Sequence, residues 1–299
     1  MPDEKEEGRV IMSRILVPVD FSAQSIQAVR FALAYAKNKH DITLLHAISP
    51  FPSRNVVRRL GREVVEDYQL DEARDDLKKF LSIIEEAGIT YELEIEFGEP
   101  HEVIAKHAAN DYAAIVMGTH GYGRITGFLL QSVSYPTLHD VKVPVFLIAE
   151  ETDEKRFPWN KVLIAVDGSD HSMEAAKKAI EMGQHLPNVS YTLLSVVIPP
   201  VTYAGVYGVG WDNMNTLEGW GRESLKPCEE MLEAASIPFE SMVVVGDPAT
   251  VIRQTAEEID AGLVVLGHHG QGAVAGTLLG SVTFKTIHRT KTPLLIVKT

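Results

Sequence analysis

The stretch that decides the fold is Arg14-Ile15-Leu16-Val17-Pro18-Val19-Asp20-Phe21-Ser22. A short apolar run that ends in a carboxylate and a hydroxyl is typical of a buried strand leading into a helix N-terminus. The pattern returns in the second half as Lys161-Val162-Leu163-Ile164-Ala165-Val166-Asp167-Gly168-Ser169. A repeated strand-to-helix junction indicates that the chain contains two copies of one unit.

Two further markers repeat in the same order. Phe97-Gly98-Glu99-Pro100 matches Val245-Gly246-Asp247-Pro248, and residues 143–148 match residues 292–297. The separation between matched markers hardly changes along the chain, so we predict a duplication with small changes in loop length. We expect an acidic disordered tail over residues 1–12, a first domain over 13–150 and a second over 151–299.

Within each copy, short apolar runs alternate with longer helical patterns, which indicates an α/β fold with a parallel sheet. The first copy predicts strands at 15–19, 42–48, 91–97, 114–117 and 145–148, and helices at 25–38, 72–87, 100–110 and 132–138. Right-handed crossovers wind five such strands into an open Rossmann-like sheet of order 3-2-1-4-5, with helices on both faces. Ligands of such sheets bind beyond the carboxyl ends of the strands.

Composition excludes several classes of protein. A net charge of -13 argues against nucleic acid and anionic membranes as partners, because both attract clustered Lys and Arg. Cys228 is the only cysteine, so neither an intrachain disulfide nor a cysteine-based zinc site is expected. No apolar run approaches the roughly 20 residues of a membrane span, and the N-terminus does not resemble a signal peptide. We therefore expect a soluble cytoplasmic protein.

A glycine-rich loop predicts a phosphate-binding site. Gly267-His268-His269-Gly270 is followed, after nine residues, by Gly280-Ser281. Glycine permits positive φ and a close approach of the backbone to a ligand, and Ser281 could cap a helix or bind an anion. The first copy has Gly118-Thr119-His120-Gly121, but Gln131 precedes Ser132 where the second copy has Gly280.

Glutamine in place of glycine at position 131 predicts that the two phosphate-binding sites differ in affinity. If φ is positive there, glutamine would cost about 1 to 3 kcal/mol in backbone strain. That strain would lower affinity by about one to two decades. Glutamine could instead donate a hydrogen bond to phosphate, but we expect nucleotide to bind more weakly in the first half, or not at all.

Other residues allow two interpretations each. His268 and His269 could be metal ligands, but we expect adjacent side chains in an extended loop to point apart and to flank phosphate or solvent. Asp20 and Asp167 could be catalytic; a base or ribose contact, or a carboxylate at a helix entry, is the interpretation we favour. His139 and His288 fit helix C-termini. Trp211 and Trp220 lie in a variable excursion, residues 198–221, and could form a lid or pack within a loop; we expect packing.

These motifs carry a resemblance to a known family. Each half resembles a universal stress protein domain, and the whole chain is similar to the tandem type. The resemblance rests on the strand that ends in Val-Asp-x-Ser, on the Gly-[Asp/Glu]-Pro step, and on Gly-x2-Gly-x9-Gly-Ser, which marks the ATP-binding branch.

The resemblance implies a set of nucleotide-binding residues. It assigns phosphate and ribose to the glycines and the serine of the loop, adenine to the surroundings of Asp167, and an apolar lining to the base pocket. In the second half the implied set is Ala165, Asp167, Val196, Leu266, Gly267, Gly270, Gly280, Ser281, Val282 and Thr283. In the first half it is Asp20, Ala47, Gly118, Gly121 and Ser132.

The resemblance further implies an ATP-binding stress-response regulator, with Mg2+, in which nucleotide held mainly in the second domain acts as a switch. We expect at most a slow ATPase, because no Walker-type motif or assignable arginine finger is present. The alternative is an oligomeric scaffold with a vestigial site. In either case the last strands of the two halves could pair within the chain, and a homodimer of tandem chains would need another surface. An enzyme acting on nucleotide-activated substrates is a third possibility, but the Ser-Gly-Gly-x-Asp-Ser loop is missing.

Overall fold

The computed structural model describes residues 14–37, 40–119, 133–184, 186–198, 211–271 and 279–299, with the side chains of 211–215 excepted. The predicted tail, residues 1–12, lies outside these ranges. None of the helices in the described ranges is long and apolar enough to cross a membrane.

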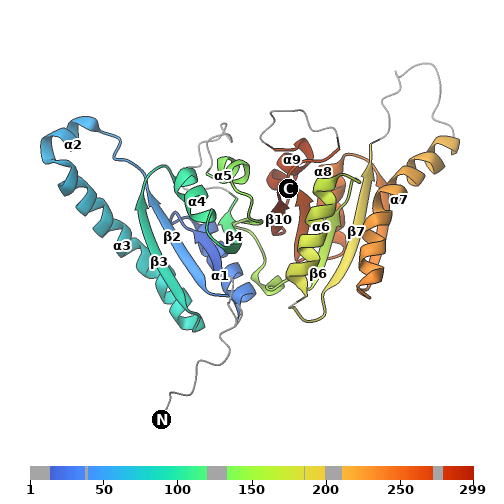
Figure 1. Cartoon of the computed structure of the whole chain (residues 1–299), viewed down its shortest axis with the longest axis horizontal. Coiled ribbons are helices and arrows are strands. Elements are labelled where there is room, and N and C mark those ends of the chain that lie inside the picture. Colours follow the sequence, from blue (N-terminus) through green and yellow to red (C-terminus); the bar gives the residue numbers. More distant parts are fainter. Residues whose placement is uncertain (1–13, 38–39, 120–132, 185, 199–210, 272–278) are drawn as a thin grey trace, which may run out of the picture.

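The described strands form one ten-stranded sheet in the order β3-β2-β1-β4-β5-β10-β9-β6-β7-β8 (Figure 1). Each half therefore has the order 3-2-1-4-5, as predicted. The first half contains β1 (Arg14–Pro18), β2 (Ile42–Ile48), β3 (Tyr91–Phe97), β4 (Tyr112–Gly118) and β5 (Val145–Ile148). The second contains β6 (Lys161–Ala165), β7 (Ser190–Val197), β8 (Phe239–Val245), β9 (Leu263–Gly267) and β10 (Leu294–Val297).

The two halves join through their last strands. β5 and β10 pair antiparallel, with Phe146 opposite Leu295, whereas the other strand pairs are parallel. The expectation that these strands pair within the chain is confirmed. Pairing saturates the backbone hydrogen bonds of two apolar edges that would otherwise be open to other chains.

Helices cover both faces of the sheet, and each face has its own apolar core. One core receives α1 (Ala23–Ala36), α3 (Arg62–Ala87), α6 (Asp170–Gly183) and α7 (Trp211–Ala234). The opposite core receives α4 (Pro100–Ala108), α5 (Ser134–Asp140), α8 (Pro248–Glu258) and α9 (Ser281–Arg289). Both cores run through the two halves, so burial of apolar surface couples the halves as well as stabilising each one.

The predicted helix starts are observed at the junctions that follow β1 and β6. Ser22 caps α1 by accepting a hydrogen bond from the backbone N–H of Ser25, and Ser169 caps α6 by accepting one from Ser172, both at 3.2 Å. Pro100 and Pro248 open α4 and α8, where the missing N–H is harmless. The caps fix the direction in which the chain leaves Asp20 and Asp167.

Aromatic side chains fill the junction between the halves. Trp159, in the segment that links them, is only 1% exposed and lies 4.9 Å from the Tyr35 ring and 5.6 Å from the Phe31 ring, both on α1. On the opposite face, Tyr135 of α5 lies 5.3 Å from Phe284 of α9. These contacts add apolar burial to the β5–β10 pairing on both sides of the sheet.

The first excursion is more helical than predicted. Residues 54–60 form α2 (Arg54–Leu60), and α3 begins at Arg62 rather than at residue 72. Gly61, with φ 90°, separates the two helices. Both are largely exposed here, so the sequence lacks the apolar periodicity that burial imposes on a helix.

Candidate functional site

The second half contains a cavity of about 700 Å³ at the carboxyl ends of β6, β7 and β9. This volume falls in the usual range for small-molecule sites. All ten residues that the sequence singled out in this half line the cavity: Ala165, Asp167, Val196, Leu266, Gly267, Gly270, Gly280, Ser281, Val282 and Thr283. The predicted crevice and the observed cavity therefore coincide in this half.

Asp167 lies at the centre of a hydrogen-bond network. Its Oδ1 accepts hydrogen bonds from the Ser169 N–H at 3.0 Å and from the Ser169 hydroxyl at 2.6 Å, and its Oδ2 accepts one from the Gln271 N–H at 2.7 Å. Burial raises the pKa of this carboxyl, but the hydrogen bonds outweigh burial and leave the pKa below its ordinary value. Asp167 is thus an ionised helix-entry carboxylate that also holds the loop after β9.

Close contacts leave little room for a side chain at the glycines of the loop. A Cβ on Gly270 would collide with Asp167 Oδ2, and one on Gly267 would lie 2.8 Å from the carbonyl carbon of His171. At Gly280 a Cβ would lie 3.2 Å from both His268 O and His269 Cα. Gly280 has a φ of -62°, so glycine is not required here for a positive φ. The matched residue, Gln131, lies outside the described residues. Packing against the loop, rather than strain, disfavours glutamine here.

The start of α9 faces the cavity without a side-chain cap. Gly280 is the N-cap residue, and Ser281, expected as a possible cap, is instead the first residue of the helix. Thr283 donates its hydroxyl hydrogen bond to Gly267 O at 2.8 Å and fastens the helix to the end of β9. Because no side chain caps the first turn, its backbone N–H groups are available to an anion, which the helix dipole also favours.

Comparison with known proteins agrees with this geometry. The family model described as "Universal stress protein family" matches residues 12–149 and 158–298. The chain belongs to the universal stress protein family. A universal stress protein of Mycolicibacterium smegmatis is 30% identical and one of Mycobacterium tuberculosis strain H37Rv is 31% identical; each alignment covers 95% of this chain and 96% of the relative. The crystal structure of a universal stress protein from Archaeoglobus fulgidus covers 96% of this chain and 99% of its own, at 25% identity and a TM-score of 0.72.

Two histidines follow the β9 strand of this tandem universal stress protein. His269 lines the cavity, whereas His268 is 1% exposed, and its two ring nitrogens have no hydrogen-bond partner among the described residues. Their rings lie 4.4 Å apart, so the expectation that they point apart is wrong. Burial, followed by the nearby His269, lowers the pKa of His268 to about 4. In the described part of the chain, no three potential metal-ligating side chains are arranged around a metal site.

Sequence reasoning missed the wall of the cavity formed by α7. Trp220 and Ser224 line it from this helix, and Phe284 lines it from α9. Trp220 was expected to pack within a loop, but it lies on a helix and is 54% exposed. Gly221 is the residue that could have signalled this wall, because a Cβ at this position would collide with Val243 and α7 therefore lies close to the sheet. The sequence shows the glycine, but only the structure shows the contact that requires it.

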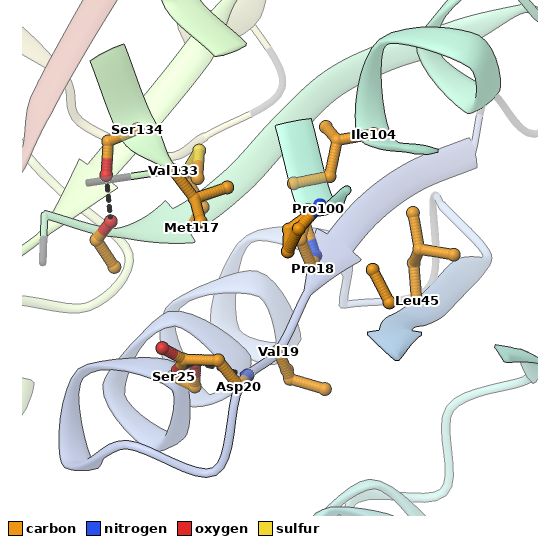
Figure 2. Close-up of a pocket in the computed structure, with 12 residues that line it drawn as sticks. Pro18, Val19, Asp20, Ser25, Leu45, Pro100, Ile104, Met117, Val133 and Ser134 are labelled. Carbon is orange, nitrogen blue, oxygen red and sulfur yellow. Dashed lines mark hydrogen bonds between the residues drawn. The ribbon is translucent and has the colours of Figure 1, made fainter. Parts of the chain in front are cut away.

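The first universal stress protein domain has a smaller cavity at the equivalent place, about 70 Å³, shown in Figure 2. Asp20, Ala47 and Gly118, three of the five residues that the resemblance implies for this half, line it. Gly121, Gln131 and Ser132 lie outside the described residues.

The internal contacts of the first cavity follow those of the second. Asp20 accepts hydrogen bonds at 2.6 Å from the hydroxyls of both Ser22 and Ser25. Ser134 donates to Gly118 O at 3.1 Å, which repeats the link that Thr283 makes to Gly267 (Figure 2). The duplicated sequence therefore preserves the frame of the site in both halves.

Proposed function

We propose that the protein is an ATP-binding stress-response regulator that holds nucleotide mainly in its second half, as a switch and with little or no hydrolysis. One observation carries the proposal: a cavity of about 700 Å³ is lined by all ten residues that the resemblance implies for the second half, among them the four residues of the glycine-loop pattern. Membership of the universal stress protein family adds support, because the same pattern marks the nucleotide-binding branch in the resemblance described above.

The lining suggests an orientation for the ligand. The phosphates would lie at the uncapped start of α9, against Gly270 and Gly280, where backbone N–H groups are concentrated. The base would lie against the apolar side chains of Ala165, Val196 and Leu266. The described lining residues include no lysine or arginine, so a triphosphate would rely on Mg2+ for charge neutralisation.

The same geometry favours binding over hydrolysis. A general base needs a free lone pair aimed at the attacking water. Both carboxyl oxygens of Asp167 already accept hydrogen bonds from Ser169 and Gln271, and this engagement lowers the pKa of the group. Asp167 is therefore better suited to holding the loop than to accepting a proton.

A rival function is an oligomeric scaffold with a vestigial nucleotide site. It draws support from the continuous ten-stranded sheet, which unites the two halves without any ligand. The two proposals differ in one measurable respect, because only the first requires nucleotide binding at physiological concentrations.

Calorimetric titration of Mg-ATP into nucleotide-stripped protein tests the proposal. We expect one site per chain, with affinity lost in Gly280→Gln, because the new side chain would press on His268 and His269. Gly219→Gln is the matched control, since a Cβ at Gly219 meets nothing within 4 Å. Two sites would mean that the first half also binds, and no binding in the parent protein would favour the scaffold.

A further inference from the structure

Exposed apolar side chains gather at two places on the protein. Among the described residues, the exposed large apolar side chains are Ile198 and Trp220, which line the cavity, and Leu60, Val64 and Tyr68, which do not. The second group is 58 to 65% exposed and recurs every fourth residue from the end of α2 into α3. Clustered apolar surface of this kind usually marks a binding site.

We infer that this region is the surface through which two copies of the chain dimerise. The region, called the helical arm below, comprises α2 and the N-terminal half of α3, residues 54–76. It lies at the outer end of the first half, beyond β3 and far from the β5–β10 junction (Figure 1). A second copy could therefore occupy it without disturbing the junction between the halves.

The charge pattern of the helical arm is self-complementary. Its beginning is basic, with Arg54, Arg58, Arg59 and Arg62, and α2 contains no acidic residue. Residues 63–76 of α3 are acidic overall, with one arginine, Arg74, against seven carboxylates: Glu63, Glu66, Asp67, Asp71, Glu72, Asp75 and Asp76. Val64 and Tyr68 lie within this part of α3, close to α2. A twofold contact that sets α2 of each copy against α3 of the other would therefore bring opposite charges together.

A twofold axis near Glu66 satisfies this pattern. Val64 of one copy would then face Tyr68 of the other, because both are displaced by about 3 Å from the axis along the helix. Asp71 and Asp75 would approach the α2 arginines of the second copy. Such an isologous contact uses the same patch twice and closes at a dimer.

Charge also favours a second copy over other occupants. Residues 54–76 contain five arginines and seven carboxylates, and the whole chain has a net charge of -13, so an anionic membrane would repel both the arm and the rest of the molecule. The last strands of the two halves, β5 and β10, are already paired with each other, and the strands at the two edges of the sheet, β3 and β8, contribute none of the exposed large apolar side chains among the described residues. The helical arm therefore remains the exposed apolar surface, outside the cavity, that the described residues offer to a second copy.

Sedimentation velocity over a range of concentrations tests the inference with the full-length chain. We expect a reversible dimer in the parent protein and a roughly 100-fold weaker one in Val64→Glu/Tyr68→Glu, because paired carboxylates would be buried in the contact. Mg-ATP affinity, measured on the same variant, should be unchanged, which also shows that the variant folds. A parent protein that stays monomeric, or a dimer insensitive to this change, would overturn the inference.

Charge reversal tests the antiparallel arrangement. Arg58→Glu/Arg59→Glu and Asp71→Lys/Asp75→Lys should each weaken the dimer. An equimolar mixture of the two variants should restore it, because the heterodimer pairs opposite charges at both contacts, and the fourfold variant should restore it for the same reason. Failure of the fourfold variant to recover would overturn the arrangement. Tyr68→Cys gives an independent check, since Cys228 is buried: a short thiol cross-linker should join two copies through Cys at 68 but not through Glu181→Cys on α6, which is exposed.

Discussion

Asp167 Oδ2 accepts a hydrogen bond of 2.7 Å from the backbone N–H of Gln271, 104 residues later in the chain. This contact joins the end of β6 to the loop that follows β9. The two strands lie side by side in the sheet, so one carboxylate sets the position of the glycine-rich loop relative to the cavity. The loop is therefore held in place by contacts within the protein itself.

Replacing Asp167 with asparagine should loosen this loop. The amide cannot accept all the hydrogen bonds that the carboxylate accepts, so we expect a loss of about 1 to 3 kcal/mol in the free energy of unfolding at pH 7. Because the pKa of Asp167 is lowered, its stabilisation is complete above the ordinary value of 3.8 and is lost as pH falls further. Urea unfolding at pH 7 and pH 3 should show a large difference between parent and Asp167→Asn only at pH 7. Asp170→Asn, at the start of α6, is the control, and a difference independent of pH would contradict the prediction.

His268 should make the free energy of unfolding depend on pH in a range above that of Asp167. Its folded-state pKa, about 4, lies below the ordinary 6.5, so the unfolded chain binds more protons and stability falls as pH drops from about 6.5 to about 4. The loss attributable to this group is about 3 kcal/mol. His268→Thr copies the buried Thr119 of the first half and should remove most of that loss between pH 7.5 and 4.5, as measured by chemical unfolding. His139→Gln, at an exposed site, is the control and should lose stability between pH 7.5 and 4.5 as the parent does.

A methyl group at Gly270 should damage binding while leaving the fold intact. The added Cβ would collide with Asp167 Oδ2 and force the loop away from β6. We expect Gly270→Ala to bind Mg-ATP about tenfold more weakly or worse, by calorimetry. Gly219→Ala should bind like the parent, because its Cβ lies in open space. Equal affinities for Gly270→Ala and the parent would remove the loop from the proposed site.

Trp220 should report the arrival of nucleotide. Its side chain lines the cavity and is half-exposed, whereas Trp159 is buried at the junction between the halves. Mg-ATP should change the tryptophan fluorescence of the parent and of Trp159→Phe, and the change should be much smaller in Trp220→Phe. A full response in Trp220→Phe would place the nucleotide away from the Trp220 side chain.

Much of this fold follows from local sequence patterns. The strand of residues 14–18, its Ser22 cap and the return of both in the second half determine the strand order, because right-handed crossovers leave few alternatives. Residues 54–71 of the helical arm escaped prediction, because α2 has no buried residue and Gly61 interrupts the helical pattern. Trp220 and the close packing of Gly280 escaped for another reason. Their roles depend on contacts between elements that are distant in the sequence, and no local pattern records those distances.

The antiparallel contact between β5 and β10 has an evolutionary consequence. In a homodimer of single-domain chains, every mutation appears in both partners, and the dimer dissociates on dilution. In this chain the two copies are encoded separately and held together covalently, so the contact is intramolecular and independent of concentration. Each half can therefore change without the other, and the two halves already differ at the matched positions Gln131 and Gly280.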